Sequence, residues 1–125
     1  MGLIRKISCP TCGKSWEIKT GCGLQHSRLE VIADLYKTDM AQTIKQIAAD
    51  NPFPRFHFEY RVAHCVQCQS IVSVPVFEVK PDGELFIGVC PECEGESVLI
   101  HDVQASTCPM CHSKGLKCKE TGHWD

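Results

Sequence analysis

Apolar residues recur at steps of three and four in one stretch of the chain, the spacing that places side chains on one face of an α-helix. The positions are Leu29, Ile32, Tyr36, Met40, Ile44 and Ile47. Ser27 and Glu30 have the spacing of a capping box at the start of this stretch, and the pattern stops before Pro52. Thr38 is a second possible N-cap, so we predict either one helix or two helices with a break just before this residue. The apolar face is expected to pack against a sheet.

From residue 56 onward the period changes to two, which is typical of β-strands. Phe56, Phe58, Tyr60 and Val62 alternate with polar residues up to Cys65. Further strands are expected at residues 71–79, 85–89 and 97–103, with a turn over residues 80–84. Proline lacks the amide hydrogen that a strand ladder uses, so Pro75 predicts an edge position or a bulge.

Ten of the 125 residues are cysteines, and this excess changes the picture from an ordinary α+β domain to one stabilised by metal. The first residues contain no apolar segment of the length that a secretory signal needs, and no stretch approaches roughly 18 apolar residues. We therefore expect a cytoplasmic protein, in which thiols stay reduced. In that setting CxxC pairs indicate metal ligation or redox chemistry.

The two central CxxC pairs have the spacing of a zinc site. Cys65 and Cys68 are followed after 21 residues by Cys90 and Cys93. Each pair lies between two predicted strands, and the turn between the pairs would bring them face to face. Four thiolates complete a tetrahedral shell, which suits Zn²⁺. This stretch, over residues 56–103, resembles a zinc ribbon.

The remaining cysteines predict two flanking zinc sites, each with three thiolates and one imidazole. The N-terminal ligands are Cys9, Cys12, Cys22 and His26, with the spacing C-x2-C-x9-C-x3-H. The C-terminal ligands are Cys108, Cys111, Cys118 and His123, with the spacing C-x2-C-x6-C-x4-H, and His112 competes with His123. This assignment uses every cysteine and predicts three zinc ions per chain.

Other groupings of the CxxC pairs remain open. Cys90 and Cys93 could join Cys108 and Cys111, because the gap of 14 residues is also acceptable for one site. The N-terminal and C-terminal pairs could instead share one ion across the fold, which would leave two ions per chain. Iron is an alternative to zinc at the central site, because four thiolates suit both metals.

The expected fold is a small, metal-stabilised α+β protein. Its parts are an N-terminal zinc knuckle at residues 1–26, a helical segment at 27–52, a central antiparallel zinc ribbon at 56–104 and a C-terminal zinc knuckle at 105–125. The order of the CxxC pairs around the helix is similar to that of uncharacterised small bacterial proteins of the zinc-ribbon type. That resemblance implies metal binding and no particular activity.

Two enzymatic alternatives use the same cysteines. His57 and Glu59 followed by Cys90 and Cys93 resemble the H-x-E and C-x-x-C elements of zinc-dependent nucleoside deaminases. That motif needs a helix where this chain has a strand pattern, has proline where this chain has Val89, and leaves the other central pair without partners. A thiol–disulfide role needs a CxxC pair at the start of a helix, and none of the four pairs precedes a convincing helical pattern. We therefore expect no enzyme.

The residues are best interpreted as a rigid binding module. An acidic edge would suit a basic protein partner, and it comprises Glu92, Glu94, Glu96 and Asp102. A basic C-terminal tail could instead contact nucleic acid through Lys114, Lys117 and Lys119. The formal charge of −2 favours a protein-interaction adaptor by a small margin over a nucleic-acid-binding protein. No small-molecule substrate and no membrane contact are expected.

Overall fold

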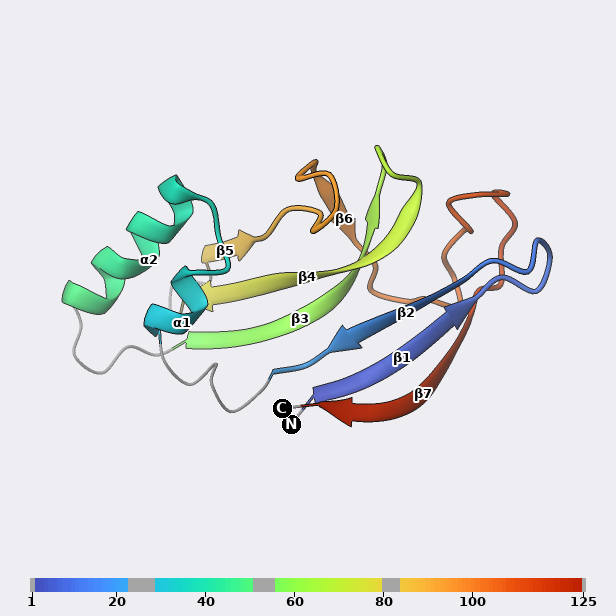
Figure 1. Cartoon of the computed structure of the whole chain (residues 1–125), viewed down its shortest axis with the longest axis horizontal. Helices are drawn as coiled ribbons and strands as arrows, with labels where there is room; N and C mark the ends of the chain where they lie inside the picture. The colour runs from blue at the N-terminus through green and yellow to red at the C-terminus, as the bar shows by residue number, and fades with distance from the viewer. Residues whose placement is uncertain (1, 23–28, 51–55, 80–83, 125) are drawn as a thin grey trace.

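The computed structural model describes residues 2–22, 29–50, 56–79 and 84–124, and within them the chain forms two antiparallel sheets and two helices (Figure 1). The strands are β1 (Gly2–Ser8), β2 (Ser15–Thr20), β3 (Phe56–Cys65), β4 (Ser70–Val79), β5 (Glu84–Ile87), β6 (Ser97–Leu99) and β7 (Lys117–Trp124). The helices are α1 (Leu29–Ala33) and α2 (Thr38–Asp50). The prediction of a small α+β protein is confirmed.

The central sheet has the strand order β5-β4-β3-β6 and contains the strands expected from the period-two pattern. Pro75 lies in β4, which is an interior strand, but the pairing of β4 with β5 ends beside it, at Val76. The position is therefore a local edge, although β4 as a whole is not an edge strand. The Gly88 amide donates to the Pro75 carbonyl at 2.8 Å, and proline has no amide hydrogen to return a bond. Among the described strands, β5 therefore pairs with β4 only at Val76–Val79, and residues 70–75 have no strand partner on that side.

The two ends of the chain form the other sheet, with the strand order β2-β1-β7. β1 pairs with β2 on one side and with β7 on the other, so Ile7 faces both Trp16 and Cys118. The N-terminal and C-terminal segments, which were expected to form separate knuckles, therefore belong to one unit. Neither the helical periodicity nor the spacing of the CxxC pairs predicted that these two segments pair as strands.

The two sheets share one topology. In each, a hairpin contains a first CxxC pair in its turn, and a second CxxC pair precedes a strand that returns to the first strand of the hairpin. The terminal unit is β1, β2 and β7 with residues 105–116, and the central unit is β3 to β6 with their connections. The central unit and the helices are inserted between the hairpin of the terminal unit and its second CxxC pair. Figure 1 shows the two hairpins lying beside each other.

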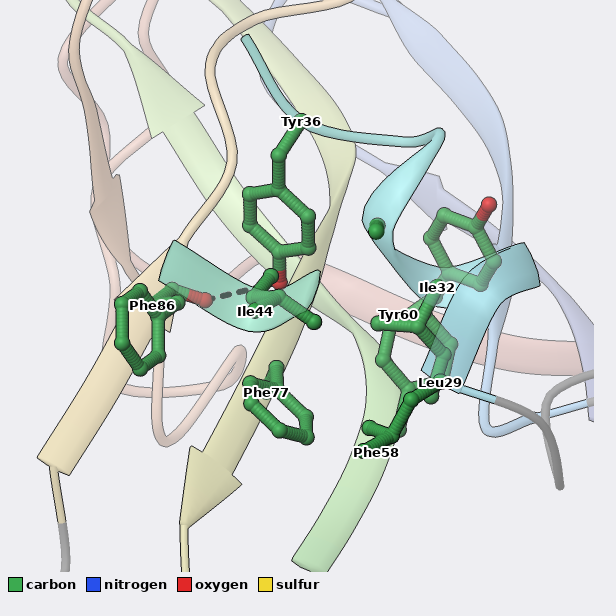
Figure 2. Packing of buried hydrophobic residues seen from close by; sticks show 9 residues of the cluster. Leu29, Ile32, Tyr36, Ile44, Phe58, Tyr60, Phe77 and Phe86 are labelled. Carbon is green, nitrogen blue, oxygen red and sulfur yellow. Dashed lines mark hydrogen bonds between the residues drawn. The ribbon is translucent and has the colours of Figure 1, made fainter. Parts of the chain in front are cut away.

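The helices cover the end of the central sheet that lies away from the CxxC pairs (Figure 1). The predicted helix break is present, because α1 ends at Ala33 and α2 begins at Thr38. Leu29, Ile32 and Ile44 pack in one cluster with Phe58 and Phe77, as Figure 2 shows. The expected capping residue Ser27 and the first four residues of the turn expected over residues 80–84 lie outside the described residues.

Tyr36 fixes the turn between the helices to the sheet. Its hydroxyl donates a hydrogen bond of 2.8 Å to the Phe86 carbonyl inside the core, drawn as a dashed line in Figure 2. Burial raises the pKa of this phenol, so the hydroxyl stays protonated and continues to donate at any physiological pH. No helix in the described part of the chain is long and apolar enough to cross a membrane.

The two units pack against each other through β2 and the β3–β4 hairpin. The indole nitrogen of Trp16 donates to the Ser70 hydroxyl at 3.1 Å. Gly21 and Tyr60 exchange backbone hydrogen bonds of 3.0 and 2.6 Å. A second apolar cluster joins the units, and it contains Ile7, Cys9, Ile18, Val62, Ile71, Cys108 and Leu116. Two cysteines of the terminal unit are thus part of the packed core between the units.

Candidate metal centres

The central cysteine group consists of Cys65, Cys68, Cys90 and Cys93, whose sulfur atoms all lie within 4.8 Å of one another. Cys65 ends β3 and Cys68 precedes β4, while the other pair lies between β5 and β6. The Cys65 and Cys93 sulfurs are 3.5 Å apart, and the Cys68 and Cys90 sulfurs are 3.9 Å apart. Cys65 and Cys90 are fully buried. The structure therefore brings together all four residues that were predicted for the central site.

The terminal cysteine group consists of Cys9, Cys12, Cys108 and Cys111, again with all sulfurs within 4.8 Å. The Cys9 and Cys111 sulfurs are 3.5 Å apart, and those of Cys12 and Cys108 are 3.8 Å apart. Within the described residues these are the two groups of three or more potential ligands. The N-terminal and C-terminal CxxC pairs thus share one site, as in the alternative with two ions.

The sulfur separations fit a metal centre and do not fit disulfides. A tetrahedron with metal–sulfur bonds of about 2.3 Å, the value for zinc, has sulfur–sulfur edges of about 3.8 Å. The four separations above, between 3.5 and 3.9 Å, lie close to that edge. A disulfide would need about 2.05 Å, and all ten cysteines are free. Each group could therefore hold one metal ion with four thiolate ligands.

The two groups are built from four copies of one local turn. The residue after the second cysteine of every CxxC pair has a positive φ: Gly13 at 77°, Gln69 at 52°, Glu94 at 61° and His112 at 63°. In three pairs the amide of this residue donates to the carbonyl of the first cysteine, at 2.9–3.0 Å. The left-handed conformation reverses the chain directly after the second sulfur, so both thiols of a pair point to the same side.

Backbone and hydroxyl donors favour the thiolate form at one cysteine of each group. The Cys68 amide donates to the Cys65 sulfur at 3.4 Å and lowers the pKa of that thiol to about 7. Hydrogen bonds from Ser113 lower the pKa of Cys111 to about 6. In contrast, the neighbouring Cys93 thiol raises the pKa of Cys68. Adjacent sulfurs oppose the ionisation of all four thiols together, and a bound cation removes this opposition.

Among the described residues neither predicted flanking site is assembled, and the strand geometry explains why. Cys22 lies beyond the far end of the β1–β2 hairpin, because Thr20 pairs with Leu3 while Cys9 follows the other end of β1. The six extended residues of β2 span roughly 20 Å, which places Cys22 too far from Cys9 for both to bind one ion. Cys22 packs instead beside the helical core cluster. His26, the fourth predicted ligand of that site, lies outside the described residues.

The C-terminal prediction is wrong for a similar reason. Cys118 and His123 both lie in β7, where five residues span roughly 16 Å. Cys118 is half-buried and packs at the apolar cluster between the units, whereas His123 is exposed. His112, the competing ligand, occupies the left-handed position after Cys111 and is also exposed. None of these three belongs to either cysteine group.

The deaminase-like residues are also separated from the cysteines. Cys90 and Cys93 are grouped with Cys65 and Cys68, and His57 is not a member of that group. The exposed His57 ring lies 3.7 Å from the Glu59 carboxylate on the same strand. The arrangement of one imidazole and two thiolates that the deaminase motif requires is absent from the described residues.

A glycine substitution pair tests the shared turn. Gly13→Ala places its new Cβ in open space, with nothing within 4 Å, so its effect comes from the backbone alone. We expect Gly13→Ala to lower the free energy of unfolding by about 1 kcal/mol. Gln69→Gly, at the equivalent position, should leave it unchanged or raise it by up to about 1 kcal/mol. Denaturant unfolding of the metal-loaded protein measures both, and equal losses in the two variants would contradict the shared turn.

Comparisons with known proteins give no match for this chain: no family model, no curated protein and no solved structure.

Proposed function

We propose that each cysteine group holds a structural zinc ion and that the protein is a non-catalytic module for binding another macromolecule. The observation that carries this proposal is the complete set of four thiol ligands in each group. Structural zinc sites are closed in this way, whereas catalytic ones keep a position for water or substrate. When bound, zinc would supply a fixed cross-link between the two knuckles of each unit. On this proposal both units are zinc ribbons.

The charge distribution indicates what such a module could bind. Residues 56–104, which include the central unit, carry eight Asp and Glu against two Lys and Arg. Residues 1–22 and 105–125, which include the terminal unit, carry seven Lys and Arg against three Asp and Glu. A metal ion with four thiolates adds −2 to each unit. The central unit is therefore strongly acidic, and a basic partner is its natural complement.

A cleft at the junction of the units is the best place for that partner. It has a volume of about 500 Å³ and lies between β2, the part of β4 that β5 does not pair with, and the second central CxxC pair. Three exposed carboxylates border it, those of Glu17, Glu92 and Glu94. Lys19 also lines the cleft, and its ammonium is held 4.5 Å from the centre of the Tyr60 ring. The three carboxylates outnumber this one cation.

The floor of this cleft is apolar and continues into a second cleft of about 430 Å³, which shares Leu35, Val89 and Glu94 with the first. Exposed Leu35 and Met40 line the continuation, at 37% and 39% exposure. Acidic borders around an apolar floor fit an extended basic segment that carries one or two apolar side chains. We therefore favour a protein-interaction adaptor.

A peptide titration tests the adaptor function. The probe is a short peptide of alternating lysine and valine, and the variant is Glu92→Gln/Glu94→Gln. We expect saturable binding that the double variant weakens by about ten-fold. The control, Glu30→Gln/Glu120→Gln, removes the same charge from exposed positions outside both clefts and should bind like wild type. Equal loss in both double variants would indicate general electrostatics and would count against the cleft.

Nucleic acid is the second candidate partner, and one observation favours it. Lys119 lies directly across from Lys6 in the terminal sheet, and Lys117 precedes it by two residues on the same strand. All three side chains are exposed, as is Lys114. A row of cations of this kind can follow a phosphate backbone. Salt-sensitive binding of a single-stranded oligonucleotide in place of the peptide would favour this candidate.

A further inference from the structure

A third cleft lies between the terminal and central units and has a different character. Its volume is about 290 Å³. The lining combines an apolar part, including Leu3, Val62 and Ile100, with the cationic side chains of Arg5 and Arg61 and the imidazole of His101. Neither the metal centres nor the proposed adaptor surface uses these residues. Two arginines from separate units therefore face one small space.

Arg5 is incompletely satisfied in this cleft. Its Nε atom is buried and has no hydrogen-bond partner. Arg5 lies in β1 at a shift in the register with β7, which falls between Ile4 and Arg5. A buried donor without an acceptor destabilises a fold, so such groups in folded proteins need an explanation. An acceptor beside Arg5 would supply the missing bond.

Arg61, the other arginine that lines the cleft, is held in a defined orientation. Its Nη2 donates to His101 Nδ1 at 2.8 Å, which requires that Nδ1 is unprotonated and that the neutral ring carries its proton on Nε2. The Arg61 Nε lies 3.8 Å from the Glu59 carboxylate, which offsets part of the charge. With two guanidinium groups against one carboxylate, the cleft has a net positive charge of +1.

We propose that this cleft binds a phosphate group. Guanidinium groups present planar pairs of donors that match the oxygens of phosphate, and two of them around one anion would satisfy Arg5. The volume is near the lower limit of small-molecule sites, which leaves room for a phosphate and a small organic substituent on the apolar lining. Free phosphate and a phosphate monoester share this chemistry. Because Arg5 and Arg61 come from different units, binding would also link the two units.

Two adjacent residues of β1 provide the test. Arg5→Met removes the charge and keeps an apolar stem, while Lys6→Met makes the same change at an exposed neighbour that does not line the cleft. Sodium phosphate or glycerol phosphate is titrated into the metal-loaded protein against sodium chloride of equal ionic strength, and amide and arginine Nε–Hε shifts are followed by NMR. We expect saturable shifts around Arg5 and Arg61, with affinity reduced at least about ten-fold in Arg5→Met and unchanged in Lys6→Met.

The two ligands distinguish the sources of the phosphate. Tighter binding of glycerol phosphate would assign the cleft to a monoester, and equal binding would assign it to the free anion. If Arg5→Met does not fold, Arg61→Met takes its place with the same expected loss. No saturable shift in wild type, or equal loss in Arg5→Met and Lys6→Met, would overturn the proposal.

Discussion

Replacement of Cys90 by serine is expected to remove one metal ion per chain and to unfold the central unit. Cys90 is fully buried and packs in an apolar cluster with Ala63, Cys65, Val72 and Val74. Serine is a poor zinc ligand, and the variant would leave three thiols, that of Cys65 buried, beside an uncompensated hydroxyl. Structural zinc contributes on the order of 10 kcal/mol to small motifs, comparable to the whole stability of a domain. Elemental analysis and the dispersion of amide NMR signals measure both effects.

Cys22→Ser is the matched control for this substitution. Cys22 is half-buried and lies outside both cysteine groups, so its variant should keep the full metal content and a folded spectrum. If Cys90→Ser kept its full metal content as well, the central group would not be a metal site.

Cys9→Ser and Cys108→Ser should release the same ion, although the two residues lie at opposite ends of the chain. Both are buried, with exposures of 2% and 0%, and both belong to the apolar cluster between the units. Either change should therefore disrupt β1, β2 and β7 together. The double variant should lose no more metal than either single variant, because the second substitution affects a site that is already lost.

This pair separates one shared site from two local sites. Local sites would lose one ion in each single variant and two in the double variant. Cys118→Ser and His123→Gln serve as controls, because neither residue belongs to a cysteine group and both should leave the metal content unchanged. A loss of metal in Cys118→Ser would restore the local C-terminal site and contradict the shared one.

The central unit was predictable because its signals are local. Strand β3 buries alternate residues over most of its length, so period two is visible in the sequence. The first CxxC pair lies in the β3–β4 hairpin and the second in the connection from β5 to β6, and their spacing follows the usual rule for zinc ligands. The helix break was also visible, because Thr38 is a residue that favours a helix start.

The terminal unit was not predictable because its strands carry little apolar pattern. In β7 the exposed side chains of Lys117, Lys119 and Glu120 surround half-buried Cys118, so no apolar alternation marks a strand. Its partner β1 lies at the other end of the chain, and no local spacing indicates that pairing. The cysteines and histidines nearby matched the spacing of a local zinc site, but residues spread along an extended strand cannot bind one ion together.

Only one of the four left-handed positions after the CxxC pairs is marked in the sequence. Gly13 after the first CxxC pair is typical of a zinc knuckle, but Gln69, Glu94 and His112 occupy the same conformation without glycine. Asparagine and glycine are the usual residues there, so these three positions carry no sequence mark.

Metal stoichiometry tests the central claim most directly. The protein is purified without chelator or affinity metal, its concentration is set by amino-acid analysis, and zinc and iron are measured by elemental mass spectrometry. Two closed groups of four cysteines predict two zinc ions per chain, with Cys22 and Cys118 left as the free thiols. Three ions per chain, or fewer than two after reconstitution with zinc, would contradict this account.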